Sequence, residues 1–142
     1  MKLTPGLEDY IEEIYIAHLN NIPLKAAELA RKLKVSRASV SEALTKLVIQ
    51  KLINYNRYEV IRLTDLGVNA GKEVYDKHHT IAVFFENILG IDKKEASENA
   101  CKIEHIISKS ILEKMRCFIN YYKNNESIIK KIQKGEVINE DN

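Results

Sequence analysis

The stretch that decides the fold runs from residue 25 to residue 51 and reads KAAELARKLKVSRASVSEALTKLVIQK. Apolar residues recur at helical spacing in both of its halves: Leu29, Ala30 and Leu33, then Val40, Leu44 and Leu47. Lys34-Val35 lies between the halves, and Ser36 is a residue type that caps helices. Two short helices joined by a tight turn are typical of a helix-turn-helix motif.

The flanking residues extend this motif into a winged fold. Before it, Thr4-Pro5 predicts the start of a helix that ends near Asn20, with Thr4 as its cap. After it, residues 52–63 hold β-branched and aromatic residues on both sides of a polar tip at 56–59, which predicts a hairpin. A hairpin directly after a helix-turn-helix is a wing.

The second half of the chain is predicted to be all helical. Thr64-Asp65 caps a long helix that Gly90 ends, and Asp92 caps another that runs to about Ser108. A further helix covers about 111–122, and Ser127 is expected to cap a short last one. We therefore predict a mainly α protein with a winged helix-turn-helix domain at 1–72 and a helical domain at 73–142. About 70 residues are few for an independent domain, so burial against a second copy is expected.

Charge is distributed unevenly along the chain. Its 22 Lys and Arg against 20 Asp and Glu leave a net charge of only +2. Residues 1–20 carry a net −3, whereas residues 21–51 carry seven basic side chains against two acidic ones, a net +5. This basic block coincides with the helix-turn-helix, which favours a nucleic-acid partner over a merely solvated basic face.

The predicted DNA contacts come from the recognition helix, its flanks and the wing: Lys25, Ser36, Arg37, Ala38, Ser39, Ser41, Glu42, Lys46 and Arg57. Short polar residues at a helix N-terminus let the backbone approach phosphate. Arg37 can reach phosphate or guanine, Ala38 can meet a thymine methyl, and Glu42 can accept from cytosine N4. Lys25, Lys46 and Arg57 are expected to meet phosphates.

A second constellation has the chemistry of a metal site. Cys101, Glu104 and His105 stand at i, i+3 and i+4, which places three ligand types on one helix face. His78, on the preceding helix, is a plausible fourth ligand, although an ordinary exposed histidine beside His79 fits the sequence too. Two carboxylates of the first helix, Asp9 and Glu12, could add oxygen ligands, or they could belong to a solvated acidic face.

The cysteine content and the lack of a long apolar run indicate the cellular compartment. Two cysteines, Cys101 and Cys117, do not make a disulfide framework. No apolar run approaches the roughly 20 residues of a membrane span, and the first residues lack the apolar core of a signal peptide. We expect a cytoplasmic protein without a membrane partner.

In order along the chain, these motifs resemble the diphtheria toxin repressor and manganese transport regulator family. The resemblance rests on residues 8–15, on 27–36, on Leu63-Thr64-Asp65-Leu66-Gly67, on Lys77-His78 and on Cys101-Lys102-Ile103-Glu104-His105. It implies a homodimer that binds palindromic double-stranded operator DNA when loaded with Mn²⁺ or Fe²⁺, for which Co²⁺ or Zn²⁺ could substitute. It also implies repression of metal-uptake genes.

The same resemblance assigns the metal ligands Asp9, Glu12, His78, Cys101, Glu104 and His105. His78 is preferred over His79 because its distance from Thr64 fits the family pattern. The manganese-sensing branch resembles the chain at Asp9 but has a carboxylate at the position of Cys101, whereas the iron-sensing branch has the cysteine but Met at the position of Asp9. Ala82 and Ser97 stand where the iron branch has ancillary ligands, and the expected type is the short one without an SH3-like domain.

Two other function classes compete with this interpretation. A winged-helix regulator that responds to a small organic ligand would need an apolar pocket between dimer helices and no metal. A metalloenzyme would need an open coordination position and a placed general base. The sequence holds no HExxH motif and no nucleophile with an adjacent base, so we expect neither an enzyme nor an organic substrate.

Overall fold

The computed structural model describes residues 3–123 and 125–136. The chain divides into two compact units, Met1–Tyr75 and Asp76–Asn142, here called the winged unit and the helical unit. Helix α4 (Asp65–Val83) contains the boundary.

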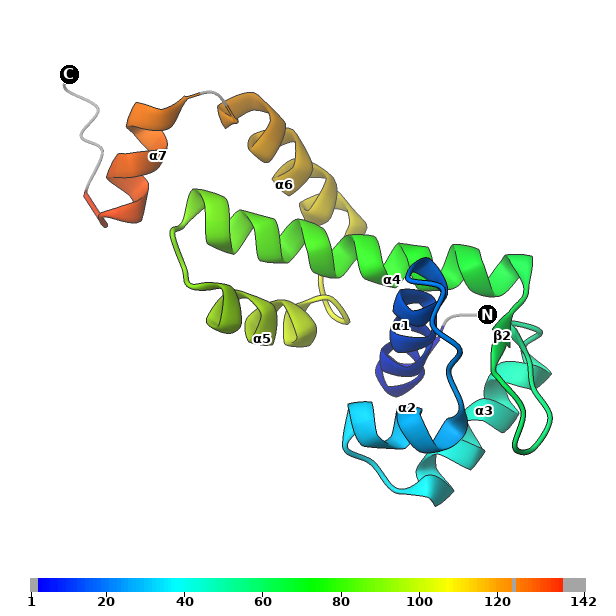
Figure 1. The fold of residues 1–142 in the computed structure, drawn as a ribbon. Coiled ribbons are helices and arrows are strands. Elements are labelled where there is room, and N and C mark those ends of the chain that lie inside the picture. Colours follow the sequence, from blue (N-terminus) through cyan, green and yellow to red (C-terminus); the bar gives the residue numbers. More distant parts are fainter. Residues whose placement is uncertain (1–2, 124, 137–142) are drawn as a thin grey trace. The chain divides into compact units, whose positions relative to one another are not determined.

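The winged unit has the predicted winged helix-turn-helix fold (Figure 1). Its helices are α1 (Pro5–Leu19), α2 (Ala26–Leu33) and α3 (Arg37–Ile49), and the first part of α4 completes it. The wing is the antiparallel pair β1 (Ile53–Asn54) and β2 (Arg62–Leu63), in which Ile53 lies opposite Leu63. The mainly α fold class is confirmed.

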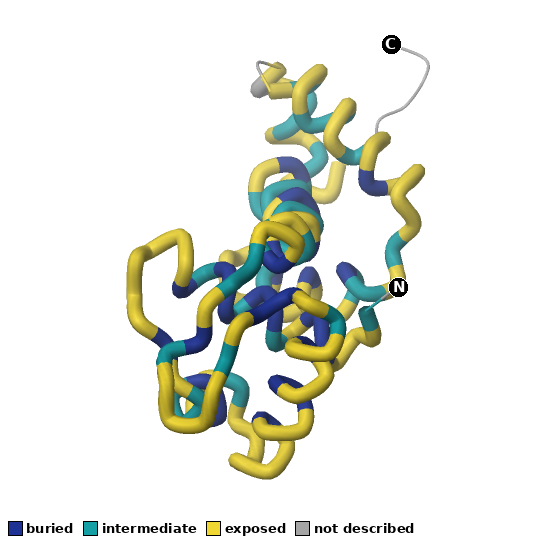
Figure 2. Tube along the Cα trace, turned by 90° about the vertical axis from the view of Figure 1, so that its right-hand side faces the viewer, coloured by how far each residue is buried: buried dark blue, intermediate teal, exposed yellow. Residues whose placement is uncertain are grey.

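Local sequence explains where α2 ends and where α3 begins. Ser36 accepts a hydrogen bond from the backbone N–H of Ser39 at 3.1 Å, so it caps α3 as predicted. Lys34 takes the left-handed conformation, with φ 55°, and ends α2. Leu29 of α2 and Val40, Leu44 and Leu47 of α3 are fully buried, so the predicted apolar faces pack into one core. Figure 2 shows the buried positions recurring along helices whose other faces are exposed.

The wing is anchored to the winged unit by backbone hydrogen bonds. The N–H of Ile61 donates to the carbonyl of Leu24 at 2.9 Å, and the N–H of Thr64 donates to the carbonyl of Leu52 at 3.0 Å. Thr64 also caps α4, because its hydroxyl accepts from the N–H of Gly67 at 3.1 Å. These bonds fix both ends of the hairpin and leave its tip in solvent.

The helical unit comprises the second part of α4, the π-helical turn η1 (Phe84–Ile88), α5 (Lys93–Ile103), α6 (Lys109–Tyr122) and α7 (Glu126–Gln133). The helices α5, α6 and α7 all pack against η1. Ile81 and Ala82 of α4, Ala100 of α5 and Leu112 of α6 form its buried core. Gly90 has φ +71°, the left-handed conformation expected for a glycine that ends a helix.

Three local predictions for this unit were wrong in detail. The helix α5 ends at Ile103, not near Ser108, because Ser108 accepts from the N–H of Ile111 at 3.2 Å and caps α6. The long helix does not stay α-helical up to Gly90, because η1 intervenes. Ser127 lies inside α7 rather than at its cap, which is Asn125.

Over the described ranges, every helix is too short or too polar to cross a membrane.

The close approach of α4 to β1 gives a stability prediction. A methyl group at Gly67 would overlap the carbonyl oxygen of Leu52 and lie 3.0 Å from Cδ2 of Leu63. We expect Gly67→Ala to lower the free energy of unfolding by about 1–3 kcal/mol, as overpacking does. A Cβ at Gly6 would meet nothing within 4 Å, so Gly6→Ala should be neutral or stabilising. Urea unfolding followed by circular dichroism compares the two; equal effects would refute the close contact.

Candidate metal centre and DNA-binding face

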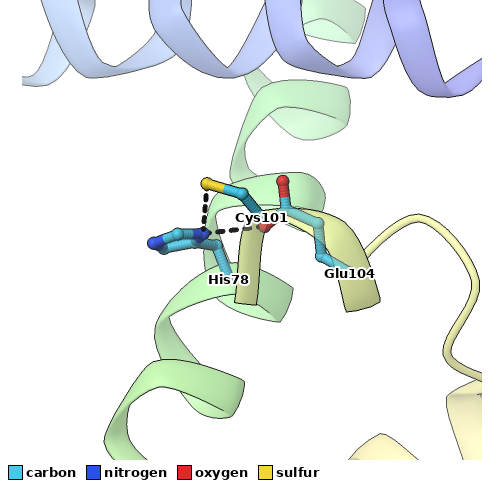
Figure 3. A group of neighbouring side chains, drawn as sticks. All are labelled: His78, Cys101 and Glu104. Atoms are coloured by element: carbon cyan, nitrogen blue, oxygen red, sulfur yellow. Dashed lines mark hydrogen bonds and ion pairs between the residues drawn. The ribbon is translucent and has the colours of Figure 1, made fainter. Parts of the chain in front are cut away.

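Three predicted metal ligands meet within the helical unit. His78 comes from α4, Cys101 from the last turn of α5, and Glu104 from the residue that ends α5. Nδ1 of His78 lies 2.9 Å from Oε2 of Glu104 and 3.6 Å from Sγ of Cys101 (Figure 3). One ligand atom from each side chain lies within 4.8 Å of the others. A single ion could therefore contact an imidazole, a thiolate and a carboxylate at once.

Glu104 is the most unusual member of this cluster. The residue is only 1% exposed. Its Oε1 has no hydrogen-bond partner in the part of the chain that the structure describes, and Nε2 of His105 lies 3.6 Å away. A buried carboxylate is costly unless positive charge or hydrogen bonds compensate it. The unsatisfied oxygen thus fits a bound cation.

The donor set indicates which cations suit the cluster. Thiolate, imidazole and carboxylate together favour first-row transition metals over Ca²⁺ or Mg²⁺, which prefer oxygen ligands. Cys101 is exposed, whereas Glu104 is buried and the His78 side chain is 20% exposed. The cluster is therefore open to solvent at its sulfur, where an ion could enter.

The prediction that Cys101, Glu104 and His105 lie on one face of one helix holds only in part. Cys101 belongs to α5, but Glu104 is its C-cap and His105 lies in the turn beyond. The N–H of Glu104 still donates to the carbonyl of Ala100 at 2.9 Å, which keeps Glu104 near the Cys101 face. Among the described residues, His78 and not His79 joins Cys101 and Glu104.

The acidic side chains of α1 differ in exposure. Glu8 and Glu12 are buried, at 7% and 9% exposure, whereas Asp9 is exposed. A fully solvated acidic face is therefore wrong for Glu8 and Glu12. Burial raises the pKa of Tyr10, and the carboxylates of Asp9 and Glu42 raise it further. Tyr10 thus stays a neutral phenol packed against the winged core. The role of Asp9 and Glu12 as ligands stays a prediction.

All nine predicted DNA contacts are exposed: Lys25, Ser36, Arg37, Ala38, Ser39, Ser41, Glu42, Lys46 and Arg57. Lys46 and Glu42 form an ion pair of 3.1 Å on α3. The Arg57 guanidinium lies 5.0 Å from the centre of the Tyr58 ring at the tip of the wing. Exposure is what DNA contact requires, and the contacts themselves stay predictions.

One contact of the metal cluster was missed by the sequence analysis. Ser97 was noted only as a residue that lacks the chemistry of an ancillary ligand, yet its Oγ lies 3.4 Å from Nε2 of His78. Two signals in the sequence could have indicated the contact: Ser97 precedes Cys101 by one helical turn, and it stands at the position of an ancillary ligand in the iron branch.

Comparison with known proteins finds a family match in each half of the chain. Residues 2–61 match the family described as the N-terminal DNA binding domain of the iron dependent repressor. Residues 64–132 match its metal binding and dimerisation domain. Together the two matches cover both units and include His78, Cys101, Glu104 and all nine predicted DNA contacts.

Individual relatives are similar over most of the chain. An uncharacterized HTH-type transcriptional regulator of Methanocaldococcus jannaschii is 40% identical over 122 residues, which are 85% of this chain and 98% of the relative. The HTH-type transcriptional regulator MntR of Lysinibacillus sphaericus is 27% identical over 92% of this chain and 93% of its own length. The solved structure of the manganese regulator SloR is 30% identical with a TM-score of 0.71; the match covers 85% of this chain but only 55% of SloR.

The buried carboxylate gives a prediction about stability in the presence of metal. Glu104→Gln keeps an oxygen for Nδ1 of His78 but removes the charge. We expect the metal-free free energy of unfolding to stay the same or to rise, because the variant no longer buries an incompletely compensated charge. Wild-type protein should gain about 2.7 kcal/mol at a Mn²⁺ concentration one hundred times its Kd, and the variant should lose most of that gain. Urea unfolding with Mn²⁺ and with chelator measures both quantities.

Glu98→Gln is the matched control, because Glu98 is an exposed carboxylate on the same helix. It should keep the metal-dependent gain. An equal gain in Glu104→Gln and wild type would mean that Glu104 is not a ligand.

Proposed function

The chain belongs to the iron-dependent repressor family of metal-dependent transcriptional regulators, and we propose that it represses metal-uptake genes by binding palindromic operator DNA as a homodimer when loaded with Mn²⁺ or Fe²⁺. The observation that carries the proposal is the buried Glu104 carboxylate beside His78 and Cys101, with an oxygen that has no hydrogen-bond partner among the described residues. The family matches support a DNA partner and a dimer.

The proposed ligand set has two sources. His78, Cys101, Glu104 and His105 are supplied by residues 73–142, the proposed metal-binding and dimerisation domain. Asp9 and Glu12 of α1 are supplied by residues 1–72, the proposed DNA-binding domain, and their inclusion rests on the resemblance. A bound divalent cation would supply the positive charge that this cluster of carboxylates and thiolate lacks.

Cys101 bears on which metal is physiological. Thiolate is softer than carboxylate, so it favours Fe²⁺, Co²⁺ or Zn²⁺ over Mn²⁺. Asp9 and Glu12 are hard oxygen donors, which suit Mn²⁺. One structural relative is described as a manganese regulator, whereas the matching family is described as iron dependent. We therefore propose Mn²⁺ or Fe²⁺ as activator, with Co²⁺ or Zn²⁺ as functional substitutes in vitro.

On DNA, the two copies are proposed to insert their α3 helices into successive major grooves. A two-fold dimer matches a palindromic site, with half-sites about 34 Å apart. Arg37, Ala38 and Glu42 would read base edges, while Lys25, Lys46 and Arg57 would hold phosphates. Ser36, Ser39 and Ser41 are short enough for the helix N-terminus to approach the backbone. A repressor of this kind acts in the cytoplasm, where the operator is.

Metal dependence then follows from shared ligands. If Asp9 and Glu12 share the site with Glu104, these carboxylates would repel one another when no cation is bound. When both sets hold one cation, the DNA-binding halves are fixed in the spacing that the operator needs. By linkage, operator DNA must tighten metal binding by the same factor by which metal tightens DNA binding. The coupling free energy is typically about 1–3 kcal/mol, which corresponds to about 5–150-fold.

The direct test is metal-dependent DNA binding. A duplex selected from a random library in the presence of Mn²⁺ serves as the probe, and fluorescence anisotropy is measured across Mn²⁺, Fe²⁺, Co²⁺ and Zn²⁺. We expect binding with metal and a large loss with chelator. Equal affinity with and without metal would contradict the proposal and would reopen the class of regulators that respond to an organic ligand.

The tip of the wing gives a second DNA prediction. Arg57→Ala should weaken binding about equally for all sequences, because an exposed arginine of the wing meets phosphate. The slope of log affinity against log salt should fall by roughly one unit. Lys109→Ala, at an exposed position of the helical unit, should leave the slope unchanged. A loss confined to the selected duplex would show that Arg57 reads bases.

Glu12→Ala should separate metal binding from DNA binding. Glu104 and His105 are adjacent in the helical unit and can hold a metal without α1. The variant should therefore keep a metal site of reduced affinity and yet lose about tenfold or more in operator affinity at saturating metal. Glu104→Ala should instead lose the metal. Calorimetry gives the metal affinity and anisotropy gives the operator affinity.

Glu13→Ala is the control on the same helix, because Glu13 is not among the proposed ligands. Wild-type operator affinity in Glu12→Ala at saturating metal would contradict the bridging role of α1.

A further inference from the structure

We propose that Ser97 is a positioning residue of the metal site, which orients the His78 ring and accepts a hydrogen bond from its Nε2–H when Nδ1 binds a metal. The inference rests on the proposed metal-binding function and deepens it. The observation is that both nitrogens of the His78 ring face a partner. Nδ1 lies 2.9 Å from Oε2 of Glu104 and 3.6 Å from Sγ of Cys101, and Nε2 lies 3.4 Å from Oγ of Ser97.

The geometry decides which nitrogen can bind a metal. Only Nδ1 faces the carboxylate and the sulfur, so Nδ1 is the donor atom for an ion held with them (Figure 3). A neutral imidazole has one N–H, and a nitrogen that gives its lone pair to a metal cannot carry it. The proton of metal-bound His78 is therefore on Nε2, and it needs an acceptor. Ser97 Oγ is at the position of that acceptor.

A hydroxyl suits this position because it can donate or accept. Without metal, Nδ1–H can donate to the Glu104 carboxylate while the Ser97 hydroxyl donates to Nε2. With Nδ1 given to a metal, Nε2–H donates to Oγ instead. The change removes the proton from Nδ1 and places one on Nε2 by exchange with water, which the 20% exposure of the His78 side chain allows, and the Ser97 hydroxyl turns from donor to acceptor. The bond matters more in the metal-bound state, because an imidazole that gives a lone pair to a cation is a stronger N–H donor. An alanine at this position would therefore cost the metal-bound state more than the metal-free one.

The placement of Ser97 also fixes the ring in space. Ser97 and Cys101 are one turn apart on α5, and they contact His78 of α4 at Nε2 and Nδ1 respectively. The His78 side chain is 20% exposed, so a lost hydrogen bond on Nε2 would be replaced only in part by water. Outer partners of metal-bound histidines typically change metal affinity 10–100-fold when removed.

The test compares three substitutions at one position in the full-length protein, with Mn²⁺ or Zn²⁺ in competition with a chromophoric chelator. We expect Ser97→Ala to weaken metal binding about tenfold or more. Ser97→Thr keeps the hydroxyl and should stay within about threefold of wild type. Ser97→Asp should bind more tightly than wild type, because a carboxylate that accepts from Nε2–H makes Nδ1 a stronger donor.

Asn99→Asp is the control for added charge. Asn99 is exposed on α5, and its amide donates to the carbonyl of Glu95 at 2.9 Å, away from His78. The gain in Ser97→Asp must exceed any gain in Asn99→Asp. A second readout is the tautomer itself: ¹⁵N spectra of Zn²⁺-loaded protein should show the His78 proton on Nε2.

Several outcomes would overturn the role of Ser97. A Ser97→Ala variant with wild-type metal affinity would contradict it. Equal losses of metal affinity in Ser97→Ala and Ser97→Thr would indicate that Ser97 contributes packing only. A His78 proton on Nδ1 in the Zn²⁺-loaded protein would also contradict it. A wild-type protein that binds no metal would instead overturn the proposed function and this role together, so the two failures are distinguishable.

Discussion

The helical unit is organised around a carboxylate that is out of water. Glu104 ends α5, is 1% exposed and faces His78 of α4 at 2.9 Å. A charge in this position costs several kcal/mol unless it is compensated. The neighbouring imidazole and its hydrogen bond compensate one oxygen, and the other has no hydrogen-bond partner among the described residues. With Nε2 of His105 at 3.6 Å and no hydrogen bond at this oxygen, the fold of this unit leaves a carboxylate oxygen available to a bound cation.

The residues of the DNA-binding face, unlike Glu104, are exposed. Its nine predicted contact residues are exposed, and α3 is held by a fully buried set of aliphatic side chains and by the Ser36 cap. The recognition helix thus needs no ligand to form. In the proposed function, metal acts on how two copies present preformed helices to DNA, and not on the folding of those helices.

Local patterns predicted most of the fold. The spacing of Val40, Leu44 and Leu47, the Ser36 cap and the polar tip of the wing are properties of short segments, and the structure confirms them. The end of α5 was not predicted, because Ser108 caps α6 instead of continuing α5. The burial of Glu104 and the contact between Ser97 and His78 were not predicted either, because both depend on side chains of α4 and α5 that meet in space. His78 and Glu104 are 26 residues apart in the sequence, and no local periodicity reports such a contact. The family resemblance identified these ligands, but it gave neither their exposure nor their partners.

The central claim is that His78, Cys101 and Glu104 together hold a metal ion, and X-ray absorption spectroscopy of the Co²⁺- or Fe²⁺-loaded protein tests it most directly. The account predicts one sulfur scatterer, at about the 2.3 Å typical of metal–thiolate bonds, together with imidazole nitrogen and carboxylate oxygen. The sulfur should disappear in Cys101→Ser and persist in Cys117→Ser. A first shell of oxygen and nitrogen alone in the wild-type protein, identical in Cys101→Ser, would contradict the assignment of the metal centre.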